Sequence, residues 1–184
     1  MPLTLDSPIV TERLLLRRVA REDLPGLFEM NGDDRVTSFL PYPTWATAAD
    51  GEAWFGRMER IQADGLALQM ALCEKDSGRA IGSCLLFRLD EGSARVELGY
   101  ALGHAHWGRG LMREALEAVI AHAFSAMRIR RIEGEVDTAN AASAALLDRL
   151  GFHREGLLRQ RWVNKGRPRD FILFGLLASD RFPG

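Results

Sequence analysis

Apolar and polar residues alternate along the chain with two different periods, and each change of period marks the border of an element. Alternation with a period of two predicts strands, and apolar residues repeated every three or four positions predict helices. The helix expected over 111–127 has an apolar face broad enough to lie on a sheet. The predicted strands are 11–18, 66–73, 79–88, 94–102, 131–137, 152–163 and 170–177, and the predicted helices are 22–31, 47–65, 111–127 and 140–150.

The order of these elements predicts an α/β fold with a mixed, largely antiparallel central sheet of about seven strands, flanked by about four helices. Short polar turns such as Asp76-Ser77-Gly78 join neighbouring strands, and hairpins of this kind are antiparallel. Only the strand, helix and strand over 94–137 require a parallel pair, because the helix returns the chain to the same end of the sheet. With 184 residues, the chain is expected to form a single domain over 1–184.

The composition excludes several classes of partner. The formal net charge is -1, so no overall field draws the chain to nucleic acid or to an anionic membrane. No apolar run approaches the roughly 18–20 residues that cross a bilayer, and the first residues lack the order of a signal peptide. Cys73 and Cys84 lie in strand-like apolar runs, where free buried thiols are expected. We therefore expect a cytoplasmic protein with no nucleic-acid or membrane partner.

A glycine-rich junction separates the fourth predicted strand from the helix that follows it. Gly108 and Gly110 allow close backbone approach, and the free N–H groups at a helix N-terminus suit a phosphate or pyrophosphate. Arg109 and Arg113 add positive charge at the same end of the helix. The phosphate-loop pattern GxxxxGK[ST] and the dinucleotide pattern GxGxxG are both absent. The alternative is a tight turn that only packs Trp107 into the core.

Segments on both sides of this junction form a pattern that extends over nearly the whole chain. These segments are ERLLLRR at 12–18, ELGYAL at 97–102, HWGRGLMREAL at 106–116, VDTANAASAALLDRLGF at 136–152, REGLLRQ at 154–160 and RDFILFGLL at 169–177. Together they resemble the GCN5-related N-acetyltransferase (GNAT) superfamily, and within it the RimJ/RimL-type branch, which acetylates N-terminal amines of ribosomal proteins. One departure is Ala105, where the superfamily often has glutamine or arginine.

This resemblance implies the GNAT fold, in which the two parallel strands splay apart, and it implies acetyl-CoA as the acetyl donor, with no metal. The pantetheine arm would lie in the splay, and the pyrophosphate would bind the amides of the glycine turn. A backbone N–H near Gly99 or Tyr100 would stabilise the oxyanion. The implied cofactor-binding residues are Leu98, Gly99, Tyr100, Ala101, Leu102, Trp107, Gly108, Arg109, Gly110, Leu111, Met112 and Asn140.

Acyl transfer to an amine requires a base, because an ammonium group cannot attack, and it requires a proton or hydrogen bond for the departing thiolate. Glu97 is the first candidate for the base, since it shares a strand face with the small residues Gly99 and Ala101. The alternatives are that Glu97 is the cross-strand partner of an arginine, or that Glu135 is the base. The resemblance implies Ser143 as the proton donor.

Two further groups of residues have a structural explanation beside the functional one. Asn140 lies three residues before Ser143 at a helix start, and it suits a helix N-cap as well as a contact with pantetheine. His104 and His106 lie close together, but no further ligand occurs at zinc spacing, so no metal site is expected.

Acceptor specificity is expected from the loop and helix over 39–55. Tyr42, Trp45 and Trp54 are candidates for a peptide or small-molecule groove, and packing is the alternative for all three. A basic run in the last hairpin suits either an acidic acceptor or a solvated face. The basic run comprises Arg154, Arg159, Arg161, Lys165, Arg167 and Arg169.

These observations predict an acetyl-CoA-dependent N-acetyltransferase that transfers the acetyl group directly in a ternary complex. The preferred acceptor is the α-amino group of a protein or peptide, whose reference pKa near ~8 demands less of the base than that of lysine at ~10.4. A small amine, such as an antibiotic, a polyamine or an amino acid, is the alternative acceptor. A non-catalytic module that binds acyl-CoA is the alternative class. The sequence leaves the acceptor and the oligomeric state open, with a homodimer as one option.

Overall fold

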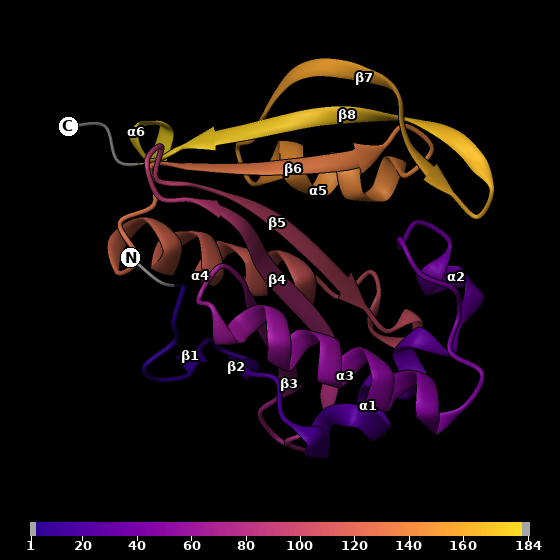
Figure 1. The fold of residues 1–184 in the computed structure, drawn as a ribbon. Helices are drawn as coiled ribbons and strands as arrows, with labels where there is room; N and C mark the ends of the chain where they lie inside the picture. Colours follow the sequence, from indigo (N-terminus) through magenta and orange to yellow (C-terminus); the bar gives the residue numbers. More distant parts are fainter. Residues whose placement is uncertain (1–2, 182–184) are drawn as a thin grey trace.

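The computed structural model describes residues 3–181, and at its centre is an eight-stranded sheet (Figure 1). The strands lie in the order β1-β2-β3-β4-β5-β6-β8-β7, and every neighbouring pair is antiparallel except β5 and β6. This confirms the predicted mixed, largely antiparallel sheet. The strands are β1 (Ile9–Val10), β2 (Leu14–Arg18), β3 (Leu68–Glu74), β4 (Ala80–Asp90), β5 (Arg95–Leu102), β6 (Arg131–Asp137), β7 (His153–Asn164) and β8 (Arg167–Leu177).

The longer helices occur at the four predicted places, and two short helices accompany them. The start of α3 is fixed locally, because the Asp50 carboxylate accepts a hydrogen bond from the backbone N–H of Thr47 at 2.8 Å. Within residues 3–181, no helix is long and apolar enough to cross a bilayer. The helices are α1 (Leu24–Asn31), α2 (Asp34–Thr37), α3 (Ala48–Ala63), α4 (Leu111–Ser125), α5 (Ala141–Arg149) and α6 (Ala178–Arg181).

The helices cover both faces of the sheet (Figure 1). Alternation along β3 sends Leu68, Met70 and Leu72 into the larger core cluster, which includes the buried faces of α4 and α5. Ala71 and Cys73 point the other way, into a smaller cluster with residues of α1 and α3. Strand β3 is therefore buried on both faces, and its sequence LQMALCE is a nearly continuous apolar run instead of an apolar–polar alternation.

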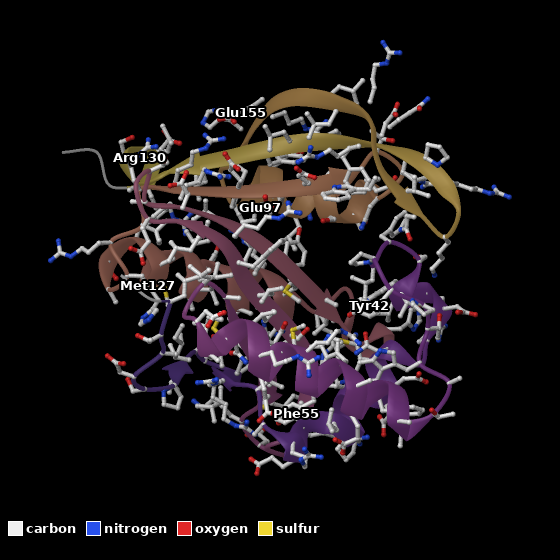
Figure 2. The ribbon with its side chains drawn as sticks, viewed as in Figure 1. Tyr42, Phe55, Glu97, Met127, Arg130 and Glu155 are labelled. Carbon is white, nitrogen blue, oxygen red and sulfur yellow. The ribbon has the colours of Figure 1, made fainter. Side chains whose placement is uncertain are left out.

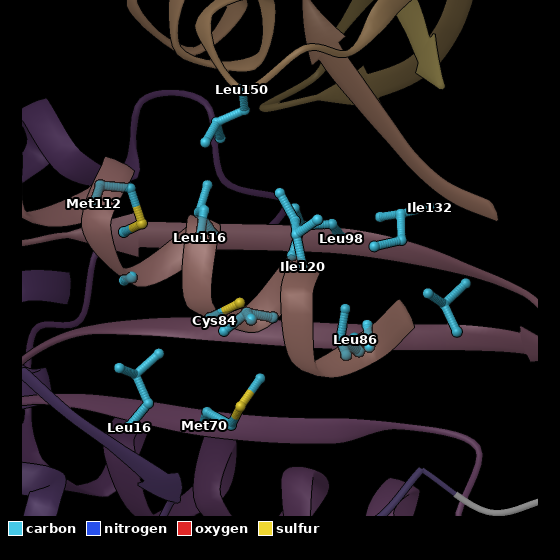
Figure 3. Close-up of a cluster of buried hydrophobic side chains, with 14 of the residues drawn as sticks. Leu16, Met70, Cys84, Leu86, Leu98, Met112, Leu116, Ile120, Ile132 and Leu150 are labelled. Carbon is cyan, nitrogen blue, oxygen red and sulfur yellow. The ribbon is translucent and has the colours of Figure 1, made fainter. Parts of the chain in front are cut away.

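Helix α4 supplies the centre of the larger cluster, as the close-up shows (Figure 3). Leu116 and Ile120 are fully buried there, against strand residues such as Met70 and Leu86. Complete burial of one such leucine or isoleucine stabilises the fold by about 1.5–3 kcal/mol. This packing fixes the helix, and with it the glycine turn at its N-terminus.

The parallel pair is short, and this determines where a site can form. Strands β5 and β6 pair over three residues only, Arg95 to Glu97 with Arg131 to Glu133. Beyond Glu97, β5 continues beside β4, while β6 continues beside β8. The two halves of the sheet therefore diverge, as the ribbon shows (Figure 1).

Three differences from the prediction concern the sheet, α1 and the last hairpin. The two-residue strand β1 makes the sheet eight-stranded, and so short a strand has no detectable period. Helix α1 begins at Leu24 after a 3-10 turn, two residues later than expected. The last hairpin turns at Lys165 and Gly166, both with positive φ, so Pro168 lies inside β8 rather than in the turn.

Candidate functional site

A cavity of about 1000 Å³ opens where β5 and β6 diverge. Its walls come from β5, the glycine turn, β6, the start of α5, the loop after α2 and the last hairpin. Almost all of the predicted donor-binding and catalytic residues line it. They are Glu97, Leu98, Gly99, Tyr100, Ala101, Leu102, Trp107, Gly108, Gly110, Leu111, Met112, Asn140 and Ser143.

One wall of the cavity is a strand edge without a strand partner. From Leu98 to Leu102, β5 pairs with β4 on one side, but its parallel pairing with β6 has already ended. Free backbone N–H and C=O groups on such an edge can pair with an extended molecule that contains amides. The pantetheine arm, which contains two amides, fits this edge.

The glycine turn has the conformation that anion binding at a helix N-terminus requires. Gly108 and Gly110 have φ of 72° and 75°, and Gly110 is the N-cap of the 15-residue helix α4. A Cβ added to Gly108 would meet no atom within 4 Å, so the space beside its backbone is open. The helix N-terminus offers unpaired N–H groups and positive potential to a ligand in that space.

Two side chains in this turn do not lie as expected. The Arg109 guanidinium does not line the cavity, because it lies against Glu74, 3.6 Å from the carboxylate, and His106. Arg109 is therefore the one predicted donor-binding residue that does not line the cavity. Trp107 is 47% exposed rather than packed in the core, and its indole N–H donates to the Leu102 carbonyl at 2.7 Å.

Two hydroxyl groups meet on the cavity wall. The Tyr100 and Ser143 oxygens lie 2.7 Å apart, which joins β5 to the start of α5. Burial raises the pKa of Tyr100 to about 12, so this hydroxyl stays protonated at neutral pH. Asn140 caps α5, since its side-chain oxygen accepts from the Ser143 N–H at 3.1 Å, and it also lines the cavity. The Tyr100 hydroxyl was not predicted, because the family resemblance assigns a role only to the backbone of that residue.

Glu97 lies at the apex of the splay, between the diverging strands (Figure 2). Its side chain is largely buried, and Arg88 Nη1 contacts both carboxylate oxygens, at 2.8 and 3.0 Å. The expected arginine partner therefore exists, and Glu97 also faces the cavity. Arg88 has φ of 52° within a β-bulge of β4, and the bulge brings its side chain to the Glu97 face. No sequence signal marks this bulge.

A second carboxylate lines the same end of the cavity. Glu135 accepts hydrogen bonds from Arg161 at 2.9 Å and from the Trp162 indole at 2.6 Å. Burial raises the pKa of Glu135, but these hydrogen bonds outweigh it and lower the pKa overall. Trp162 also stacks on the Arg88 guanidinium, 5.2 Å from its ring centroid. The sequence had marked Arg161 only as part of a basic run, and it gave no signal for Trp162.

The predicted acceptor residues Tyr42, Trp45 and Trp54 do not line this cavity, and Tyr42 and Trp45 line a separate, smaller one of about 150 Å³. Trp45 and Trp54 are 6% and 5% exposed, with ring centroids 5.7 Å apart in the smaller core cluster. Tyr42 hydrogen-bonds Asn31, and its burial raises its pKa. These aromatic residues fill the core because α3 packs its apolar face on the sheet. The cavity is lined instead by the neighbouring loop residues 39–41.

Among residues 3–181, no group of three or more histidine, cysteine or acidic side chains is arranged to hold a metal ion. His106 lines the cavity, and the His104 ring lies 4.8 Å from the Trp107 ring. Cys73 and Cys84 are free and buried, as predicted.

The arrangement can therefore hold an anion at one end, an extended amide-containing arm along β5, and an amine near the carboxylates. These are the parts of acetyl-CoA and of its acceptor. Comparison with known proteins agrees with this assignment, because residues 13–153 match the family model described as Acetyltransferase (GNAT) domain.

Similar proteins extend over nearly the whole chain. The uncharacterized N-acetyltransferase p20 of Bacillus licheniformis is 32% identical, over 94% of this chain and 97% of that protein. The [Ribosomal protein uS5]-alanine N-acetyltransferase of Escherichia coli (strain K12) is 30% identical, over 96% and 93%. The crystal structure of a probable acetyltransferase (GNAT family) from Chromobacterium violaceum superposes with a TM-score of 0.86 at 29% identity, covering 97% of this chain and 89% of that one. The chain therefore belongs to the GNAT family and is an acetyl-CoA-dependent N-acetyltransferase.

Proposed function

We propose that this enzyme acetylates the N-terminal α-amino group of a protein or peptide, by direct transfer in a ternary complex. The observation that supports this acceptor best is the charge of the cavity wall. Among the described residues, each of the three carboxylates that line the cavity is paired with an arginine. The pairs are Glu97 with Arg88, Glu135 with Arg161, and Asp137 with Arg169.

This charge pattern disfavours a polyamine acceptor. A polyamine has several positive charges, and its recognition requires carboxylates that are not already neutralised by arginines. An N-terminal amine has one positive charge, which it loses before it attacks, and its recognition does not require unpaired carboxylates. The 30% identity to an enzyme named for an N-terminal alanine of a ribosomal protein supports the same acceptor class.

The donor is proposed to lie along β5, with its pyrophosphate on the backbone of residues 107–112. The left-handed glycines, the open space beside Gly108 and the unpaired strand edge all suit this placement. When bound, acetyl-CoA supplies the activated acetyl group and a thiolate leaving group. Backbone N–H groups near Gly99 and Tyr100 are proposed to stabilise negative charge on the acetyl oxygen.

Glu97 is proposed to accept the proton that the acceptor ammonium loses. The carboxylate lies at the apex of the splay, and Arg88 contacts it through a single nitrogen, which leaves further lone pairs free for an amine. Arg88 thereby orients the carboxylate. Glu135 remains the alternative base, although both of its oxygens are engaged by Arg161 and Trp162.

Ser143 is proposed to donate a proton to the departing sulfur, with the Tyr100 hydroxyl as its hydrogen-bond partner. A carbon–nitrogen bond forms and a carbon–sulfur bond breaks. The acceptor nitrogen loses two protons: the ammonium gives one to Glu97, which releases it to solvent, and the nitrogen gives up the second after attack, which balances the proton that the sulfur gains through Ser143. A hydroxyl pair 2.7 Å apart can supply that proton, because the raised pKa keeps Tyr100 protonated.

The whole chain is proposed to act as one domain. The matched family model ends at residue 153, but β7 and β8 continue the same sheet. Trp162, Val163, Asn164 and Phe171 of these strands line the cavity.

The test is a panel of amines incubated with acetyl-CoA, in which release of free thiol is followed. Peptides that begin with alanine or serine should give turnover, and the same peptides with a blocked N-terminus and an internal lysine should not. Spermidine and aminoglycosides form the small-amine arm of the panel. Turnover confined to that arm would refute the proposed acceptor.

A further inference from the structure

The segment ERLLLRR, which contributed to the resemblance, contains an arginine that the proposed site does not use. Arg13 lies at the entry to β2 and is not one of the cavity-lining residues, yet its side chain reaches the glycine turn. Its Nη1 donates to the Arg109 carbonyl at 2.9 Å, and its Nε donates to Glu114 Oε2 at 2.7 Å. One guanidinium therefore joins the turn to the first turn of α4.

Glu114 is held from several directions. Its Oε1 accepts from the Thr11 hydroxyl at 2.6 Å and from the Arg13 backbone N–H at 2.8 Å. Burial raises the pKa of Glu114, but hydrogen bonds from Thr11 and Arg13 outweigh it, so the pKa is lowered and the carboxylate stays charged. The Glu114 side chain is 18% exposed and that of Arg13 44%. We call the contact of Arg13 with Glu114 and the Arg109 carbonyl the Arg13–Glu114 bridge.

The direction of the Arg109 carbonyl determines the direction of the next amide. A trans peptide group is planar, and its C=O and N–H point to opposite sides. All described peptide bonds are trans. Because Arg13 holds the Arg109 carbonyl on its own side, the Gly110 N–H points away from Arg13. Gly110 lines the cavity and Arg13 does not, so that amide is available to an anion in the cavity.

We propose that Arg13 and Glu114 are positioning residues for the acetyl donor, because the Arg13–Glu114 bridge fixes the peptide between Arg109 and Gly110 with its N–H toward the pyrophosphate. This proposal rests on the placement of the pyrophosphate at the glycine turn. A turn with two left-handed glycines has other accessible conformations, and the bridge selects one of them before the donor binds.

The test measures the affinity for CoA by calorimetry, which needs no acceptor and no turnover. Arg13→Ala and Glu114→Gln should each raise the Kd for CoA roughly three- to tenfold, or about 0.6–1.4 kcal/mol, which is the contribution of one hydrogen bond. The matched control is the exposed pair of Arg21 and Glu52, which lies away from the cavity. Arg21→Ala and Glu52→Gln should leave the Kd unchanged.

The change in CoA affinity of Glu114→Gln distinguishes the Arg13–Glu114 bridge from a simple attraction between Arg13 and the phosphates. If Arg13 acted only as a cation near the phosphates, loss of the neighbouring carboxylate would tighten CoA binding. The bridge predicts the opposite sign, so unchanged or tighter binding in Glu114→Gln would overturn it. Arg13→Lys keeps the charge but cannot span both acceptors, and full CoA affinity in this variant would also overturn the proposal.

Gly108→Ala distinguishes failure of the bridge from failure of the pyrophosphate site, because its added Cβ would enter the open space beside the turn and would not meet Arg13. If Gly108→Ala leaves the Kd for CoA unchanged, the placement of the pyrophosphate is wrong. If it weakens binding while Arg13→Ala does not, only the bridge is wrong. In turnover, the Arg13 variants should raise the KM for acetyl-CoA and leave kcat and the acceptor KM unchanged, a split that loss of stability alone would not produce.

Discussion

The substitution Gly108→Ala tests whether the backbone of the glycine turn holds the donor. Gly108 has φ of 72°, where a residue with a Cβ is strained by about 1–2 kcal/mol. Alanine also restricts the unfolded chain more than glycine does, and this offsets about 0.4–1 kcal/mol of the strain. The net loss of stability is therefore near 1 kcal/mol. For a chain of 184 residues this lowers Tm by roughly 2–4 °C.

The new methyl group would meet no protein atom within 4 Å, so nothing in the protein adds to this loss. It would, however, occupy the space that is proposed for the pyrophosphate. We therefore expect the Kd for CoA to rise at least about tenfold, or ~1.4 kcal/mol. Calorimetry measures this Kd, and thermal unfolding without ligand measures the strain separately.

Gly78→Ala is the matched control, because Gly78 has φ of 68° and its added Cβ would also meet nothing within 4 Å. This glycine lies in the turn between β3 and β4 and does not line the cavity. Both variants should lose similar stability, and only Gly108→Ala should lose CoA affinity. Equal CoA affinity in the two variants would refute the assignment of the turn to the pyrophosphate.

Four further predictions concern the chemistry of the site. Ser143→Ala should lower kcat by about 10²-fold, the low end for a general acid, with the KM for acetyl-CoA unchanged. Tyr100→Phe should lower kcat by a smaller factor than Ser143→Ala. In the wild-type enzyme, ionisation of Tyr100 should cause no loss of activity below about pH 11, because burial raises the pKa of Tyr100 to about 12. Glu97→Gln should lower acceptor kcat/KM most near pH 7 and least above about pH 9, where an α-amino group of pKa ~8 is already neutral. Cys73 and Cys84 should not react with a thiol reagent at pH 8 until the protein is denatured, because burial raises their pKa values to about 11 and about 12.

Steady-state kinetics and thiol titration check these four predictions. Wild-type turnover in Ser143→Ala would refute the role of Ser143 as the proton donor. A defect in Glu97→Gln that does not change with pH would indicate that the Glu97 carboxylate has a structural role and is not the base. Fast labelling of the native thiols would contradict the burial of both cysteines, and it would also complicate thiol-release assays.

The backbone geometry of the proposed donor side was predictable, because the sequence encodes it locally. Glycine at 108 and 110 indicates a left-handed turn, and the apolar period that begins at Leu111 indicates the helix behind it. The alternation over 94–102 likewise predicts which side of β5 meets the core. Each of these features involves residues that are close together in the chain.

The side chains of the proposed acceptor side were not predictable, because they meet only in the folded sheet. Arg88 reaches Glu97 through a bulge whose positive φ falls on an arginine, a residue type that gives no hint of it. Trp45 and Trp54 are chemically suited to a groove as well as to a core, and only the packing of α3 on the sheet decides between them. The indole of Trp162 reaches Glu135 from 27 residues away.

Gly134 gives part of the physical reason why β5 and β6 diverge. A Cβ at this position would lie 3.2 Å from Leu147 Cδ1, closer than most real contacts, so its absence lets β6 lie tightly on α5. Strand β5 meanwhile stays with β4, and the hydrogen bond between Tyr100 and Ser143 spans the resulting gap to α5. Because α5 contacts β6 at Gly134 and β5 through this bond, one short helix both maintains the opening and presents the proposed acid within it.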